Sequence, residues 1–209
     1  SQTEHEVALE DWLAYLSDPD LAGEMDLLEI CGGMAGTTRL ALRRKLKCGR
    51  NFDLVTNCDL TDPIQAKLLY EYVRIHKPLV VVAGPPCTSY GPWALLNRIV
   101  NHKAWLKSRQ VGECIALVCL EVFKMQVYGG RHFVCENPDQ SEIWTEAKLL
   151  PLWNEIKDHL AQQPHPDVRL VDVTFPQCCL GLVHPRTRQP IQKLTKIRAT
   201  ARPLWHRFV

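Results

Sequence analysis

The feature that most restricts the fold is an uninterrupted apolar run at residues 79–83, Leu-Val-Val-Val-Ala, which stops at Gly84-Pro85-Pro86. The run is shorter than a typical buried helix and is rich in the β-branched residue valine, which favours extended backbone. A strand without polar positions has no face for water, as is typical of parallel strands that are covered by helices on both sides. The run therefore predicts an inner strand of an α/β sheet.

Strand and helix patterns alternate on either side of this run. This order predicts an α/β fold with a doubly wound, mostly parallel sheet. We expect one domain over residues 1–209, with an N-terminal helical extension over 1–25 and a basic C-terminal segment over 176–209. The other predicted strands are 26–30, 52–56, 131–135, 168–175 and one near 191–197, and the predicted helices are 7–16, 37–46, 62–75, 103–127 and 149–161.

Cysteine usage and charge indicate the compartment and the partners. The chain has nine cysteines, an odd number without the paired spacing of a zinc ribbon, so we expect free thiols and a reducing compartment inside the cell, the nucleus in a eukaryote. No apolar run is long enough to cross a membrane. The net charge is only +2, but the stretch from Arg186 to Arg207 carries seven Lys or Arg and no acid. Such a segment favours contact with nucleic-acid phosphates, with a solvated basic surface as the alternative.

The loop after the first predicted strand, Glu29 to Gly36, is rich in glycine. In doubly wound sheets ligands bind beyond the carboxyl ends of the strands, and glycines let the backbone approach them closely. A plain tight turn is the alternative, but Glu29 would repel a pyrophosphate and suits the positively charged methionine end of S-adenosylmethionine. The predicted cofactor-binding residues are Glu29, Cys31, Gly32, Gly33, Met34, Gly36, Asp59 and Pro85.

Two aspartates flank the second predicted strand. Asp59 follows it, where a carboxylate can accept hydrogen bonds from a ribose or an adenine amino group, and we interpret it as a ligand-binding residue. Asp53 is interpreted as a helix cap or a solvated charge.

The loop after 79–83 presents Cys87. Two prolines stiffen this turn, and a thiolate is an intrinsically strong nucleophile, so we predict a reactive cysteine rather than a buried structural one. Glu136 follows the predicted strand 131–135, where burial would raise its pKa and make it a proton donor. A carboxylate that caps the next helix is the alternative for Glu136.

The order of these motifs resembles the C5-cytosine methyltransferase family. The resemblance covers about residues 26 to 138, and the matching positions are Cys31, Gly33 and Gly36 in the first loop, Pro86 and Cys87 at the nucleophile, and Glu136 and Asn137 at the acid. More narrowly, residues 83–88 and 136–138, together with Trp144 and Gln177-Cys178, are similar to compact methyltransferase-like domains carried by some eukaryotic retroelements.

The resemblance implies S-adenosylmethionine as the cofactor and nucleic acid, DNA rather than RNA, as the partner. It implies that Cys87 adds to cytosine C6 while Glu136 protonates N3, and that Asn137 orients the loop. The target base must then be flipped out or single-stranded. Ser89 is expected near the nucleic acid. Arg186 and Arg188 take the place of the family's Gln-x-Arg-x-Arg arginines or form a basic surface loop.

The sequence also departs from the family pattern. Thr88 replaces the usual Gln, Pro138 replaces the usual Val, and we expect no large target-recognition domain between Trp144 and Val209. We therefore expect a further domain or a partner to supply target recognition. An amino-methyltransferase is disfavoured because Gly84 stands where those enzymes have an acid or amide. A non-catalytic module that binds nucleic acid or a partner remains the alternative function.

Overall fold

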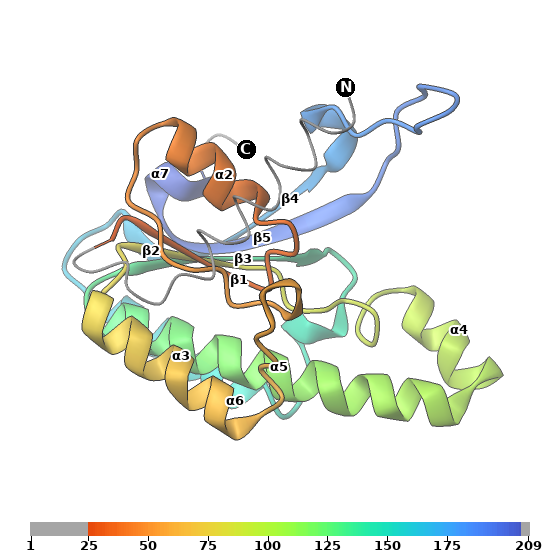
Figure 1. The fold of residues 1–209 in the computed structure, drawn as a ribbon, viewed down its shortest axis with the longest axis horizontal. Coiled ribbons are helices and arrows are strands. Elements are labelled where there is room, and N and C mark those ends of the chain that lie inside the picture. The colour runs from red at the N-terminus through yellow and green to blue at the C-terminus, as the bar shows by residue number, and fades with distance from the viewer. Residues whose placement is uncertain (1–24, 206–209) are drawn as a thin grey trace.

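The computed structural model describes residues 25–205, which form a five-stranded sheet of order β1-β2-β3-β5-β4 (Figure 1). Strands β1, β2 and β3 are parallel, and β5 runs antiparallel to both β3 and β4. Four strands therefore share one direction, which confirms the α/β fold with a mostly parallel sheet. The bounds are β1 Leu27–Ile30, β2 Val80–Ala83, β3 His132–Pro138, β4 Val168–Pro176 and β5 Leu194–Ala201.

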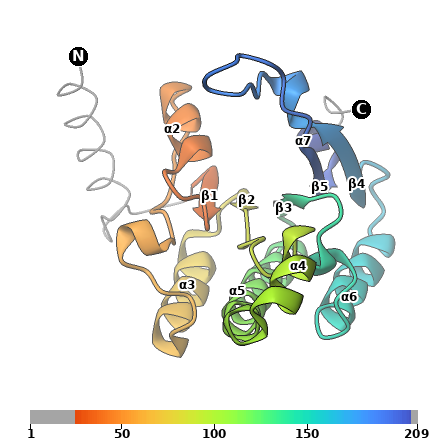
Figure 2. The same ribbon diagram turned by 90° about the vertical axis from the view of Figure 1, so that its right-hand side faces the viewer.

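Helices cover both faces of the sheet (Figures 1 and 2). Helices α3 (Pro63–His76), α5 (His102–Tyr128) and α6 (Leu150–Ala161) pack on one face, and α2 (Gly36–Arg43) and α7 (Arg202–Trp205) lie on the other. The first face holds stacked aromatic rings, with the ring centroids of Phe123 and Phe133 4.2 Å apart. Helix α4 (Trp93–Val100) projects with the start of α5 beyond the sheet.

Several predicted elements differ from the structure. Residues 52–56 do not form a strand: Phe52 makes only an isolated bridge to Ile30, and Asp53 then caps a 3-10 helix over Leu54–Thr56 by accepting from the Val55 N–H. The predicted strand 131–135 continues to Pro138 because β5 pairs with it along this length. Helix α4 was not predicted, and the predicted helix 7–16 lies outside the described residues.

All nine cysteines are free thiols. Within residues 25–205, none of the helices combines the length and the apolar character that crossing a bilayer requires.

Candidate active site

Three cavities lie around the carboxyl ends of β1, β2 and β3. The first, which we call the loop cavity, has a volume of about 250 Å³ and separates the Gly-rich loop from the Pro-Pro turn. The second, which we call the nucleophile cavity after the predicted role of Cys87, has a volume of about 520 Å³ and contains that residue. The sheet cavity, of about 650 Å³, contains Glu136. The loop cavity is lined by Cys31, Gly33, Phe52, Asp53, Leu54, Cys58, Leu60, Gly84, Pro86 and Ile115.

The Cys87 loop is held from two sides. The Cys87 carbonyl accepts hydrogen bonds from the backbone N–H groups of Tyr90 and Gly91, at 3.1 and 2.7 Å, which closes a turn directly after Cys87. The buried side chain of Asn137 donates a 2.8 Å hydrogen bond to the Pro85 carbonyl. Strand β3 therefore fixes the position of the loop that follows β2, and Cys87 is left half-buried at the cavity wall.

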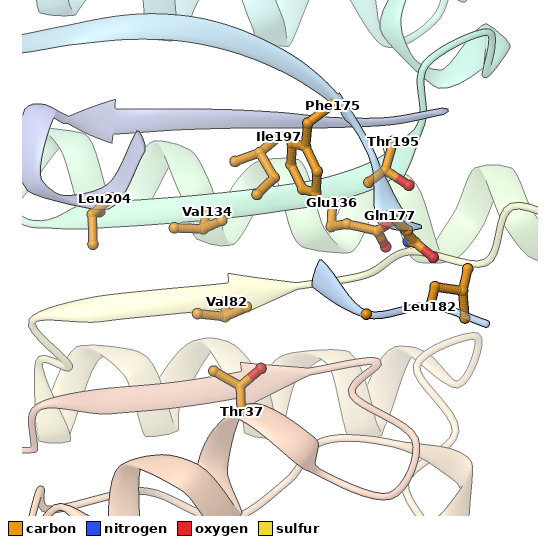
Figure 3. Close-up of a pocket in the computed structure, with 11 residues that line it drawn as sticks. Thr37, Val82, Val134, Glu136, Phe175, Gln177, Leu182, Thr195, Ile197 and Leu204 are labelled. Carbon is orange, nitrogen blue, oxygen red and sulfur yellow. The ribbon is translucent and has the colours of Figure 1, made fainter. Parts of the chain in front are cut away.

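Glu136 lies in strand β3 itself and points into the sheet cavity (Figure 3). Its side chain groups with those of Gln177 and Thr195 at one end, whereas Val82 and Val134 form an apolar wall. The Oε1 atom of Glu136 is buried and has no hydrogen-bond partner among the described residues. Burial raises the pKa of Glu136, and the positive charge of Lys193 and the neighbouring Thr195 hydroxyl oppose that rise. This carboxyl group is therefore suited to carrying a proton.

Gly84 brings the loop cavity and Glu136 together. A Cβ placed on Gly84 would lie 3.6 Å from the Cys31 carbonyl oxygen and 3.8 Å from Oε2 of Glu136. Because Gly84 also lines the loop cavity, a ligand in that cavity approaches both the Pro-Pro turn and the carboxyl group.

The Gly-rich loop has an unusual backbone. Cys31, Gly33 and Ala35 all have left-handed φ values, of 54°, 53° and 53°. For Cys31 and Ala35 this conformation costs about 1–2 kcal/mol each, and such strain concentrates at functional sites. The loop is fixed by Asp53, which accepts from the Gly33 N–H at 2.9 Å, and by Asn51, which donates to the Gly33 carbonyl at 3.0 Å.

Glu29 is placed differently from what the sequence led us to expect. Its carboxylate accepts hydrogen bonds from the Thr38 N–H and hydroxyl, at 2.8 and 2.6 Å, and from the Thr37 N–H at 3.4 Å. Only 4% of Glu29 is exposed, and it lines none of the three cavities. Its negative charge stabilises the N-terminus of α2, because the free backbone N–H groups there favour an anion.

Only two of the remaining predicted cofactor residues line the loop cavity. Cys31 and Gly33 line the loop cavity, and Pro86 lines it in place of Pro85, whose carbonyl is bound by Asn137. Gly32 packs over Glu29, and Met34 and Gly36 lie away from the cavity lining, with Met34 exposed.

Asp53 caps a 3-10 helix, as the sequence predicted, and in addition lies at the position expected of Asp59. Asp53 lines the loop cavity, whereas Asp59 is exposed and accepts from the Thr61 hydroxyl and N–H, which lowers the Asp59 pKa. The backbone of Phe52 pairs with Ile30 at the end of β1, and this pairing places the next residue, Asp53, at the cavity.

The three residues predicted to contact nucleic acid differ in exposure: Ser89 is buried, whereas Arg186 and Arg188 are exposed. Ser89 is 1% exposed, and a Cβ on Gly112 of α5 would lie 2.5 Å from its hydroxyl. Helix α5 covers Ser89 in this structure, and its contact with nucleic acid stays a prediction. Arg186 and Arg188 lie in an exposed loop after the short 3-10 helix Gln177–Leu180.

The loop cavity has features that suit a nucleoside. Phe52, Leu54, Leu60 and Ile115 offer apolar surface, and the Asp53 carboxylate is the acceptor in the wall. A Cβ on Gly33 would have no atom within 4 Å, so the backbone there faces open space. These residues fit the adenosine part of S-adenosylmethionine, with the Pro-Pro turn and Glu136 adjoining beyond Gly84.

Comparisons with known proteins add a similarity of fold. No family model matches the sequence, and no curated protein is similar to it in sequence. Among solved structures, the fold is similar to that of the S. pombe Dnmt2 methyltransferase, with a TM-score of 0.48 and 9% sequence identity. The match covers 85% of this chain and 49% of that one, so the chain spans about half the length of the solved structure. The function is therefore argued from the site itself.

Proposed function

We propose that this chain is a methyltransferase that uses S-adenosylmethionine to methylate C5 of cytosine in nucleic acid, with DNA as the favoured substrate. One observation carries the proposal. Asn137 binds the loop that presents Cys87, while its neighbour Glu136 points a buried oxygen, without a hydrogen bond among the described residues, into the sheet cavity. Two consecutive residues of β3 thus support the proposal, since one holds the loop of the proposed nucleophile and the other is the proposed proton donor.

The chemistry requires both groups. Cytosine C5 is a poor nucleophile until a thiolate adds to C6, because the addition makes C5 the electron-rich carbon of an enamine. The Cys87 sulfur forms the bond to C6, and Glu136 gives its proton to N3 as the ring accepts the electron pair. The bound cofactor supplies the methyl group from its sulfonium. Loss of the C5 proton to water then breaks the sulfur–C6 bond, releases the Cys87 thiolate and returns the N3 proton to Glu136.

The environment of Glu136 supports its role as the acid. A general acid must hold its proton at the working pH, and burial raises the pKa of Glu136. Its buried oxygen has no partner in the described part of the chain, so a substrate nitrogen would supply the missing hydrogen bond.

The decisive experiment is covalent trapping with cytosine that carries fluorine at C5. In the presence of S-adenosylmethionine the fluorine cannot leave as a proton does, so the Cys87 adduct accumulates and is seen as a band of lower mobility in a denaturing gel. Cys87→Ser should abolish the band. Glu136→Gln should slow its formation by about 100-fold or more, the usual contribution of a general acid. Cys179→Ser changes an exposed thiol and is the matched control. An adduct that survives Cys87→Ser contradicts the proposal.

Cofactor binding has its own test. Gly33→Val places a side chain in the open space beside the loop cavity, so calorimetry should show much weaker binding of S-adenosylmethionine. Gly130→Val is the matched control, because Gly130 also has a positive φ, 67°, and no atom within 4 Å of an added Cβ, but lies after α5. Equal losses in the two variants would mean that backbone strain rather than the ligand is responsible. A purified wild-type protein that binds neither S-adenosylmethionine nor its demethylated product would leave the non-catalytic alternative.

A further inference from the structure

Helix α4 exposes an apolar face. Leu95, Leu96, Ile99 and Val100 are 56, 51, 83 and 74% exposed. The pairs Leu95–Ile99 and Leu96–Val100 have the i,i+4 spacing that places side chains next to each other on one face of a helix. The helix projects beyond the sheet with the first turns of α5 (Figure 1). A contiguous apolar face of this kind marks a surface that is covered by a partner.

The charge around this face indicates the partner. Residues 91–112 contain four Lys or Arg and no Asp or Glu. Three of these cations, Arg98, Lys103 and Lys107, are exposed, and Arg98 lies over the Trp105 ring with 5.4 Å to the ring centroid. Cations neutralise phosphates, and apolar side chains insert between base steps in proteins that unstack nucleic acid. The combination fits a nucleic acid at a point where its bases are separated.

The face lies beside the proposed nucleophile. Pro92 and Asn97 line the nucleophile cavity together with Cys87, and residues 192–194 line it as well. The exposed loop that carries Arg186 and Arg188 precedes residues 192–194 and projects from the other side of the sheet (Figure 2). Two basic segments, far apart in the sequence, therefore extend at the edge where Cys87 is presented.

The base of the hairpin formed by α4 and α5 is tied to the Cys87 loop. The Arg109 guanidinium on α5 donates to the Ser89 carbonyl at 2.9 Å, and lies over the Tyr90 ring with 4.1 Å to the centroid. It also forms ion pairs with Glu142, at 2.7 Å, and with Glu146. Movement of the hairpin is therefore coupled to the backbone of Ser89, two residues after Cys87.

We propose that the α4–α5 hairpin is a nucleic-acid-binding arm, in which Leu96 and Ile99 insert into the base stack beside the target cytosine. Arg98, Lys103 and Lys107 hold the flanking phosphates. The identity of the target base rests on the proposed function, but the binding and the unstacking do not require methyl transfer.

The apolar part is tested with fluorescein-labelled duplexes, one fully matched and one with a single mismatched cytosine. Wild type should bind the mismatched duplex more tightly, because an unpaired base costs less to unstack. The double variant Leu96→Ser/Ile99→Ser should bind the mismatched duplex about tenfold more weakly and lose this preference, since apolar contact area is withdrawn. Leu68→Ser/Ile75→Ser on α3 is the matched control, with residues 53 and 62% exposed, and should bind as wild type does.

The cations of the arm are tested by the salt dependence of duplex binding. Lys103→Ala/Lys107→Ala should reduce the slope of log affinity against log salt by about 1.8, at about 0.9 per phosphate contact on duplex DNA. Lys67→Ala/Lys157→Ala removes two exposed lysines from α3 and α6 and should leave the slope unchanged. The apolar variant should also keep the wild-type slope.

Other outcomes overturn the proposal. Wild-type affinity and mismatch preference in Leu96→Ser/Ile99→Ser would exclude insertion. Loss of self-association by that variant in sedimentation, with unchanged duplex binding, would assign the face to a second copy of the chain. Loss of binding to phosphatidylserine vesicles, again with unchanged duplex binding, would assign it to a membrane. Failure of the proposed function is distinguishable, because duplex binding would respond to α4 while no Cys87 adduct formed.

Discussion

The backbone at Gly32 closes directly over the side chain of Glu29. A Cβ on Gly32 would lie 2.5 Å from the Cγ and Cδ atoms of Glu29, closer than carbon atoms approach each other without bonding. The Gly-rich loop therefore buries the carboxylate that binds the first turn of α2. Glycine at position 32 is explained by this contact inside the protein.

We predict that Gly32→Ala destabilises the fold by about 1–3 kcal/mol, because Glu29 must leave its buried hydrogen-bond partners on α2. The free energy of unfolding in urea measures this. Gly36→Ala is the matched control: its added Cβ meets no atom within 4 Å, and Gly36 is the first residue of α2, so the change should stabilise by about 0.4–1 kcal/mol because alanine restricts the unfolded chain. A neutral Gly32→Ala would mean that Glu29 has another low-energy position.

The raised pKa of Glu136 predicts a pH dependence of stability. The unfolded carboxyl titrates near 4.5, and burial raises the folded value, so above pH 4.5 the folded state holds a proton that the unfolded state loses. Wild-type stability should therefore fall as the pH rises through the window between the two pKa values. Glu136→Gln should remove this dependence and be more stable than wild type above pH 4.5, as measured by urea unfolding.

The control for this prediction is Lys193→Ala. Because the Lys193 charge lowers the Glu136 pKa, its removal should extend the pH window upward. An identical pH profile for wild type and Glu136→Gln would show that the folded carboxyl titrates normally.

Removing Arg109 should be costly. Its side chain is 13% exposed and bridges two carboxylates and a backbone carbonyl. Arg109→Ala should reduce the free energy of unfolding by about 2–4 kcal/mol, less than for a fully buried pair because Glu142 is partly exposed. Arg74→Ala breaks an exposed pair with Glu71 and should cost no more than about 1 kcal/mol. Similar losses for the two variants would argue against Arg109 as the attachment of the hairpin.

Asn137→Asp should loosen the Cys87 loop. A carboxylate cannot donate to the Pro85 carbonyl and would repel it, so the loop loses the hydrogen bond that holds it to β3. We expect Cys87 to react faster with iodoacetamide, measured by peptide mass spectrometry relative to the exposed Cys179. The fully buried Cys135 reports global unfolding and should stay unmodified. An unchanged ratio of Cys87 to Cys179 labelling would contradict the role of Asn137.

The sequence predicts the buried strands well because their signal is local. The valine run over β2 and the capped start of α3 at Asp62 need no distant partner to be recognised. Helix α4 was missed because it spans only eight residues, Trp93–Val100, directly after Gly91-Pro92. Its two i,i+4 apolar pairs are too few to distinguish it from a loop in the sequence.

The roles of single site residues depend on contacts that the sequence does not show. Ser89 is covered because Gly112, on another element, leaves room for its hydroxyl. Glu29 and Asp53 are both acids after a strand, yet the first binds α2 and the second lines the loop cavity. The hydrogen bond from Asn137 to Pro85 joins segments that are 52 residues apart.

The position of β5 has a consequence for how the protein is made. This strand lies between β3 and β4 in the sheet but follows both in the chain. During synthesis, β3 and β4 therefore emerge with open edges that only a later segment can pair, and unpaired edges of this kind invite aggregation. Thr195 and Ile197, which line the sheet cavity beside Glu136, belong to that late segment. The surroundings of Glu136 are therefore complete only after β5 has paired with β3 and β4.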